Sequence, residues 1–243
     1  MSKSIAVFGT GPGLGQAIAR RYAREGYEVA LVSRSPDRVA DGLSRTGVAA
    51  HPITGDLSDT DALTDLIDRV RAAVGDLDAF YYASSPGTIW NPLFTPAATL
   101  TPEPVRQYMP IAVYTLLELV GAFLPHMLEQ GSGAILVAQG AAALSGRPGM
   151  SGPGLALAAQ RNYLQSLQAE VADRGVSVVR LYIAAAIENT PFHAGLSARR
   201  EAAKASGAPV PGMPTANPDD LAELMWSMHR TGDHCEATYP ATR

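Results

Sequence analysis

Short apolar runs alternate with stretches of helical periodicity along the first third of the chain. The apolar runs predict buried strands at residues 5–8, 26–32, 48–53 and 78–82. Between them, the apolar spacing predicts helices over 13–25, from Ser35–Pro36 onward, and over 59–73. Ser35 and Ser58 are expected to cap the second and third helices, with Pro36 in the first helical position. Strands that alternate with helices in this way predict βαβ units and a parallel sheet.

The second half of the chain continues the alternation more loosely. Further strands are predicted at 134–137 and 176–183, and helices at 105–129, 155–173 and 219–229. Two segments, 86–104 and 190–214, are expected to be loops that line a substrate pocket. Because there is no internal repeat and no linker, residues 1–243 are expected to form a single α/β domain. Its predicted architecture is a Rossmann-like, doubly wound parallel sheet.

Composition places the chain among globular proteins and limits the kinds of partner that it is expected to bind. Hydrophobic residues make up 47% of the 243 residues and charged residues 17%, which is enough to bury a substantial core. The formal net charge is -4, from 19 basic and 23 acidic residues, and there is no run of basic residues. This balance argues against nucleic-acid binding. The single cysteine, Cys235, cannot form an internal disulfide, and no zinc-binding spacing is present, so no metal is expected.

The N-terminal residues and the lengths of the apolar runs predict where in the cell the protein is found. Residues 1–4 lead directly into the first strand and leave no room for a signal peptide. No apolar stretch approaches the roughly 20 residues that a membrane-spanning helix needs. We therefore expect a soluble cytoplasmic protein with no membrane partner.

A glycine-rich loop, Gly9-Thr10-Gly11-Pro12-Gly13-Leu14-Gly15, separates the first strand from the first helix. A helix N-terminus presents free N–H groups and partial positive charge, which favour a phosphate. Glycine allows the backbone to turn sharply and to approach a pyrophosphate closely. The order strand, loop, helix predicts dinucleotide binding, and the alternative is a tight turn that holds no ligand.

The end of the second strand predicts which dinucleotide is bound. An acidic residue there would bind the ribose 2′-hydroxyl of NAD, whereas an arginine would accommodate the 2′-phosphate of NADP. The chain has Ser33-Arg34-Ser35 at this point and no acidic residue before Asp37. This pattern favours NADP(H) over NAD(H), and the alternative is that Arg34 is a solvated surface charge.

Several motifs in this order resemble the short-chain dehydrogenase/reductase family over residues 4 to about 190. They include the glycine loop, Asp56-Leu57 after the third strand, Leu124-Pro125-His126-Met127 on a long helix, and Gly133–Val137. The resemblance implies a nicotinamide cofactor. The positions implied to contact it are Gly9, Gly11, Gly13, Leu14, Gly15, Ser33, Arg34, Asp56, Leu57, Ala83, Ile187 and Thr190.

The chain departs from this family at the catalytic positions. The family uses an Asn, a Ser, a Tyr and a Lys, with the tyrosine hydroxyl as the general acid or base. Counting from the matching motifs places these four positions at Ala112, Gly140, Pro153 and Leu157. None of these side chains can donate or accept a proton. The sequence contains no Tyr-x-x-x-Lys in any register, so a small alignment shift does not restore the set.

Three functions remain open at this point. The first is NADP-dependent reduction of a small molecule with another proton donor, for which Tyr82, Tyr114, Gln139 and His193 are candidates. Their plainer interpretations are core packing for the tyrosines, a loop cap for Gln139 and simple exposure for His193. The second function is dinucleotide binding without turnover, as a sensor or scaffold. The third is non-redox chemistry on the same fold.

The remaining expectations concern the substrate and the assembly. Trp90, Phe94, Phe192 and Met213 lie in the two loop segments and predict a small apolar substrate. Family members pair through helices that correspond to the two long helices predicted in the second half. The resemblance therefore implies a homodimer or a homotetramer.

Overall fold

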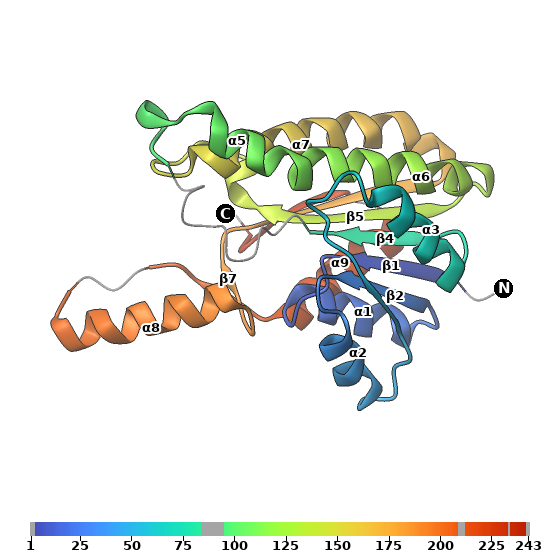
Figure 1. Ribbon diagram of the computed structural model, residues 1–243, viewed down its shortest axis with the longest axis horizontal. Helices are drawn as coiled ribbons and strands as arrows, with labels where there is room; N and C mark the ends of the chain where they lie inside the picture. The colour runs from blue at the N-terminus through green and yellow to red at the C-terminus, as the bar shows by residue number, and fades with distance from the viewer. Residues whose placement is uncertain (1–2, 84–94, 209–211, 233, 242–243) are drawn as a thin grey trace.

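The strands of the computed structural model lie side by side in one parallel sheet (Figure 1). The structure describes residues 3–83, 95–208, 212–232 and 234–241. Within them, seven strands follow the order β3-β2-β1-β4-β5-β6-β9. Their bounds are β1 Ser4–Phe8, β2 Glu28–Ser33, β3 His51–Thr54, β4 Ala79–Tyr82, β5 Gly133–Gly140, β6 Val176–Ile183 and β9 Glu236–Tyr239. The strand order reverses direction between β1 and β4, which is where doubly wound folds bind ligands.

Helices cover both faces of the sheet, and each face has its own apolar core. Side chains of α1 (Leu14–Arg24), α2 (Asp37–Ser44) and α9 (Pro218–Thr231) pack on one face. Side chains of α3 (Leu63–Val74), α6 (Thr115–Glu129) and α7 (Ser151–Val171) pack on the other. Burial on both faces explains why β1, β2, β4, β5 and β6 are largely apolar. The predicted Rossmann-like, doubly wound α/β fold is confirmed.

Two predicted helix caps are wrong. Helix α2 begins at Asp37 after Pro36, with no side-chain cap. The N–H and the hydroxyl of Ser58 both donate to Oδ1 of Asp56, at 2.9 and 2.7 Å. This local turn uses the Ser58 side chain, and α3 begins only at Leu63. Serine bonds to nearby groups in turns as readily as at helix starts, and sequence alone does not distinguish the two.

The long helix of the second half begins at Pro102 and contains a π-helical turn. Helix α5 (Pro102–Met109) continues through the turn Pro110–Tyr114 into α6. This run has 28 residues and a mean hydropathy of 1.6 over its most apolar window, so its length and composition suit a membrane span. The expectation that no such stretch exists is wrong. In this fold the helix packs on the sheet beside α3 and α7, as a core helix does.

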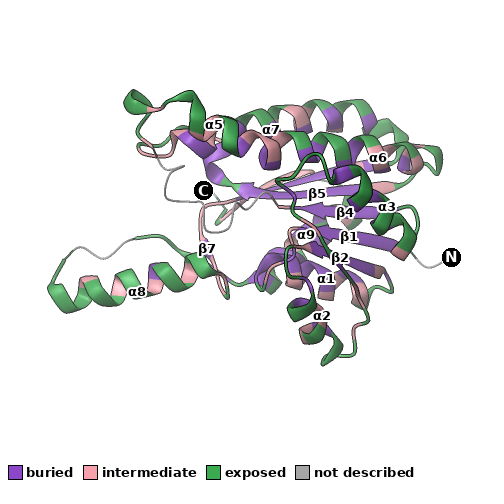
Figure 2. Cartoon of the chain, in the orientation of Figure 1, coloured by how far each residue is buried: buried purple, intermediate pink, exposed green. Residues whose placement is uncertain are grey.

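Four elements after β6 were not predicted: a helix and three short strands. Helix α8 (Pro191–Ser206) occupies much of the segment expected to be a loop, because Thr190 accepts the His193 N–H and Gly207 ends the helix in a left-handed conformation. Figures 1 and 2 show α8 projecting from the body and largely exposed, beside the small sheet of β7 (Ala186–Ile187) and β8 (Thr215–Ala216). Strand β9 extends the main sheet by pairing with Arg180–Ile183 of β6.

Candidate functional site

The glycine loop packs closely on its neighbours on one side and is open on the other. Gly9 has φ +95°, and a Cβ there would lie 2.7 Å from the Ala83 carbonyl oxygen. A Cβ at Gly15 would lie 2.8 Å from the Gly9 carbonyl oxygen, whereas a Cβ at Gly11 would meet nothing within 4 Å. Gly9 and Gly15 are therefore required by the turn itself. Gly11 borders the space into which a ligand can approach the backbone.

The N-terminus of α1 opens onto this space. Its N-cap is Gly13, which has no side chain to cap the first turn. The amides of Gln16 and Ala17 bond to the Gly11 and Gly13 carbonyls. The amides before them, at Leu14 and Gly15, belong to the part of a helix that has no intrahelical acceptor. Together with the positive end of the helix dipole, this arrangement suits a pyrophosphate.

Arg34 and Asp56 lie at the carboxyl ends of neighbouring strands. Arg34 is exposed after β2, and Ser33 beside it is half-buried. Hydrogen bonds from Ser58 lower the pKa of Asp56, and the positive charge of Arg34 lowers it further. Arg34 is thus close enough to Asp56 to influence it electrostatically. Leu57 is buried, and its carbonyl accepts a 2.6 Å hydrogen bond from Thr115.

The residues after β4 and β6 complete the same edge of the sheet. The Ala83 N–H donates to the Phe8 carbonyl, so Ala83 lies beside the start of the glycine loop. A Cβ at Gly13 would lie 2.6 Å from Cγ2 of Thr190 and 3.4 Å from Cγ2 of Ile187. The segment after β6 therefore touches the glycine loop. The structure brings the predicted cofactor positions from both halves of the chain to one edge of the sheet.

The four positions that correspond to the family's catalytic residues lie on two helices and at the end of a strand. Pro153 and Leu157 are one turn apart on α7 and buried, and a Cβ at Gly140 would lie 3.7 Å from Cδ1 of Leu157. Ala112 is fully buried in the π-helical turn, where its carbonyl accepts a hydrogen bond from Nε2 of Gln160 on α7. Sequence reasoning missed Gln160. A polar residue on the apolar inner face of α7 was the available signal.

The candidate proton donors lie in very different surroundings. Tyr82 is fully buried and donates its hydroxyl to the Ile111 carbonyl, and burial raises its pKa well above the ordinary value. Tyr114 is 49% exposed on the long helix. His193 is half-buried in the first turn of α8. Gln139 is only 5% exposed, and neither atom of its amide has a hydrogen-bond partner among the residues that the structure describes.

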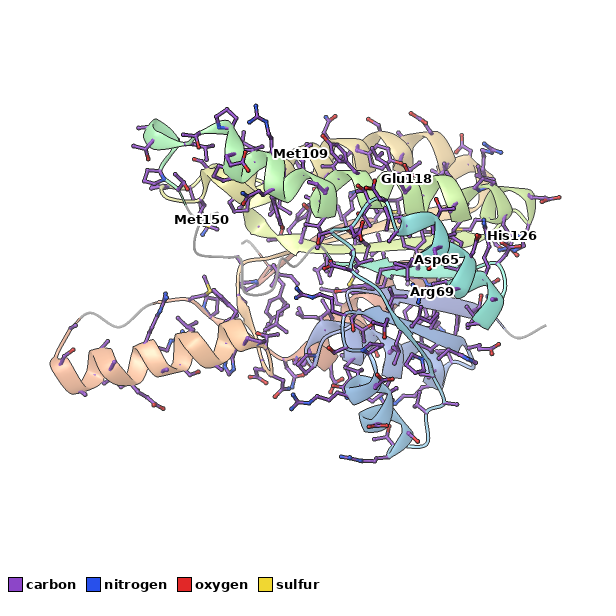
Figure 3. The ribbon with its side chains drawn as sticks, viewed as in Figure 1. Asp65, Arg69, Met109, Glu118, His126 and Met150 are labelled. Atoms are coloured by element: carbon purple, nitrogen blue, oxygen red, sulfur yellow. The ribbon has the colours of Figure 1, made fainter. Side chains whose placement is uncertain are left out.

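A cavity of about 470 Å³ lies at the N-terminus of α7 and is lined by the loop after β5 and by Met150. Met150 is labelled in Figure 3. Its lining on α7 comes from Ser151, Gly154, Leu155 and Ala158 and does not include Pro153 or Leu157.

The predicted apolar substrate residues are only partly described by the structure. Phe192 and Met213 are exposed, whereas Trp90 and Phe94 lie outside the described residues.

Comparison with known proteins gives the family. Residues 3–201 match the family model described as short chain dehydrogenase, so the chain belongs to that family. The cis-4-hydroxycyclohexanecarboxylate dehydrogenase of Sinomonas cyclohexanicum is 30% identical over 224 residues, which cover 90% of this chain and 86% of that protein. The glucose 1-dehydrogenase of Gluconobacter oxydans is 28% identical over 181 residues, 72% of this chain and 66% of that protein.

Solved structures share the fold over nearly the whole chain. L-sorbose reductase from Gluconobacter frateurii, complexed with NADPH and L-sorbose, has a TM-score of 0.81 and 21% identity, covering 98% of this chain and 94% of that one. A 3-oxoacyl (acyl-carrier-protein) reductase from Agrobacterium tumefaciens, with NADP bound, has a TM-score of 0.82 and 21% identity, covering 97% and 91%. At this level of identity the likeness concerns the fold alone.

Proposed function

We propose that the protein is a cytoplasmic NADP(H)-dependent oxidoreductase with an atypical active site that acts on a small apolar molecule. The observation that carries this proposal is the glycine loop, which is tightly packed at Gly9 and Gly15 and open at Gly11, beside the N-terminus of α1. The family membership and the NADP(H)-bound structural relatives support it.

Each part of the cofactor has a matching group at the carboxyl edge of the sheet. The α1 N-terminus would hold the pyrophosphate, and Arg34 with Ser33 would hold the 2′-phosphate. Asp56 and Leu57 would contact the adenine, and Ile187 and Thr190 would border the nicotinamide. When bound, the reduced cofactor supplies a hydride, and the chain's own residues position the substrate.

The kind of substrate is inferred from the side chains at the four positions that correspond to the family's catalytic residues. Ala112, Gly140, Pro153 and Leu157 provide no proton and no hydrogen bond to a developing alkoxide. An iminium carbon needs only the hydride, because its nitrogen is neutralised by the electron pair released from the C=N bond. A conjugated enone takes the hydride at its β-carbon, and the resulting enolate is protonated by solvent. Substrates of these two kinds suit this site better than simple ketones.

A substrate panel tests this proposal on the unmodified protein. NADPH oxidation is followed with ketones, enones and cyclic iminium ions of similar size. We expect turnover of an iminium or enone substrate and ketone rates at least about 100-fold lower, since a positioned general acid contributes about 10²–10⁴-fold. Brisk ketone reduction would contradict the proposed loss of the catalytic set. Cofactor binding without turnover of any substrate would favour the alternative, a dinucleotide-binding sensor or scaffold.

The choice of cofactor is tested at Arg34. An arginine-phosphate hydrogen bond contributes about 1.5–3 kcal/mol, so Arg34→Ala should weaken NADPH binding by roughly tenfold or more and leave NADH binding nearly unchanged. Both affinities are measured by fluorescence titration. Arg45→Ala, at the far end of α2, removes the same charge from an exposed position and should change neither affinity. Equal affinities of the unmodified protein for NADPH and NADH would contradict the assignment.

A further inference from the structure

The side-chain amide of Gln139 is buried at the candidate site without a hydrogen-bond partner. Gln139 is 5% exposed, and neither Oε1 nor Nε2 has a partner among the described residues. Burying an unpaired amide is unfavourable, and such groups in folded proteins call for a specific explanation. Here the amide is the last side chain of β5, at the carboxyl edge where parallel sheets bind their ligands.

The alternation of side chains along β5 shows which face of the sheet Gln139 occupies. Ile135 and Val137 belong to the core beneath α6 and α7, and Gln139 follows them at the same two-residue spacing. Ala112, Pro153 and Leu157 line that face of the sheet. The unpaired amide therefore lies on the same face of the sheet as three of the four positions that correspond to the family's catalytic residues.

Three other buried polar side chains each have a partner, although Oε1 of Gln160 has none among the described residues. Tyr82 donates to the Ile111 carbonyl, and Nε2 of Gln160 donates to the Ala112 carbonyl. Tyr182, which stands opposite Gln139 on β6, has its hydroxyl 3.4 Å from Oε2 of Glu236. Gln139 differs from these side chains because both the oxygen and the nitrogen of its amide lack a partner among the described residues.

We propose that Gln139 recognises the substrate through a paired hydrogen bond, and that the substrate carries a neutral amide edge, as in a lactam or a primary carboxamide. This inference rests on the proposed function, because it places the substrate at the same site. Oε1 needs a donor and Nε2 needs an acceptor, and a cis amide offers both on one planar edge. A ketone or ester would leave Oε1 unpaired. A carboxylate would add an unpaired charge to an apolar wall.

The test compares two ligands of the same shape on the protein saturated with NADPH. 3,4-Dihydro-2-quinolone presents a lactam edge, and 3,4-dihydrocoumarin replaces its N–H with an oxygen. Calorimetric titration should show the lactam binding at least about tenfold more tightly, since each unpaired buried group weakens binding. Equal binding of the two ligands, or no binding of either, would overturn the proposal.

Two variants separate recognition from structure. Gln139→Met removes the amide at similar volume; it should lower lactam affinity about tenfold, abolish the preference over the lactone and leave NADPH affinity unchanged. Gln160→Met should instead lower the melting temperature, because it leaves the Ala112 carbonyl unpaired, and should keep the lactam preference. A Gln139→Met protein that keeps the preference overturns the inference. If the unmodified protein does not bind NADPH, the proposed function itself is contradicted.

Discussion

At the scale of single residues, the glycines of the loop after β1 serve different purposes. A Cβ at Gly15 would meet backbone atoms, the Gly9 oxygen at 2.8 Å and the Thr10 Cα at 3.0 Å, whereas a Cβ at Gly11 meets nothing within 4 Å. Gly15→Ala should therefore lower the free energy of unfolding by about 1–3 kcal/mol, as overpacking does. Gly11→Ala should fold normally and bind NADPH more weakly. Urea unfolding and cofactor titration measure the two effects, and equal stabilities would contradict this division.

His229 predicts how stability depends on pH. Its Nδ1 lies 2.8 Å from the Tyr22 hydroxyl between α1 and α9, and burial, followed by the charge of Lys3, lowers its pKa from 6.5 to about 4. Because the unfolded chain takes up this proton first as the pH falls, the free energy of unfolding should decrease from pH 6.5 to 4, by at most about 3 kcal/mol. Urea unfolding at several pH values measures the slope. His229→Gln should flatten it, and an unchanged slope in that variant would exclude His229 as the cause.

At the scale of elements, the carboxylate of Glu236 connects the edge strand β9 to β6 and α7 through hydrogen bonds. Glu236 accepts from Arg180 at 3.1 Å, Arg161 at 3.4 Å and Gln165 at 3.2 Å. Because the Arg180 side chain is only 8% exposed, Glu236→Gln leaves a buried charge unpaired and should cost about 2 kcal/mol of stability. Glu103→Gln, which breaks an exposed pair, should cost less than about 0.5 kcal/mol. Denaturation of both variants checks the difference, and equal losses would show that the Glu236 pairs contribute little.

At the scale of the whole molecule, helices α6 and α7 leave apolar side chains uncovered. Leu117 is 40% exposed on α6, and Leu155 is 54% exposed on α7. We expect these helices to form the contact of a homodimer or homotetramer, so Leu117→Glu should shift the protein towards monomers in light scattering at micromolar concentration. Phe192→Glu changes a 44% exposed position on α8 and should leave the assembly intact. A monomeric unmodified protein would refute this expectation.

The sequence by itself determined the features that depend on neighbouring residues. The six apolar runs became β1 to β6. Five of these strands are apolar because they are buried on both faces, whereas in β3 only Ile53 is buried. The loop from Gly9 to Gly15 was recognisable because a strand, a glycine-rich turn and a helix follow one another directly. Such patterns are local, and they were enough to predict the fold class.

Only the tertiary structure decided the features that depend on distant contacts. Strand β9 is short and half-buried, and its place in the sheet depends on Arg180 and on pairing with β6, which no local pattern reveals. The hydroxyl of Tyr82 is held by a carbonyl 29 residues away, so its burial removes it from the surface of the site. Gln139 is unusual because both atoms of its amide lack a partner among the described residues, whereas Tyr82 and Tyr182 each have one. Hydrogen-bond partners depend on which elements pack together. A local sequence pattern predicts a single element and does not show its contacts with distant ones.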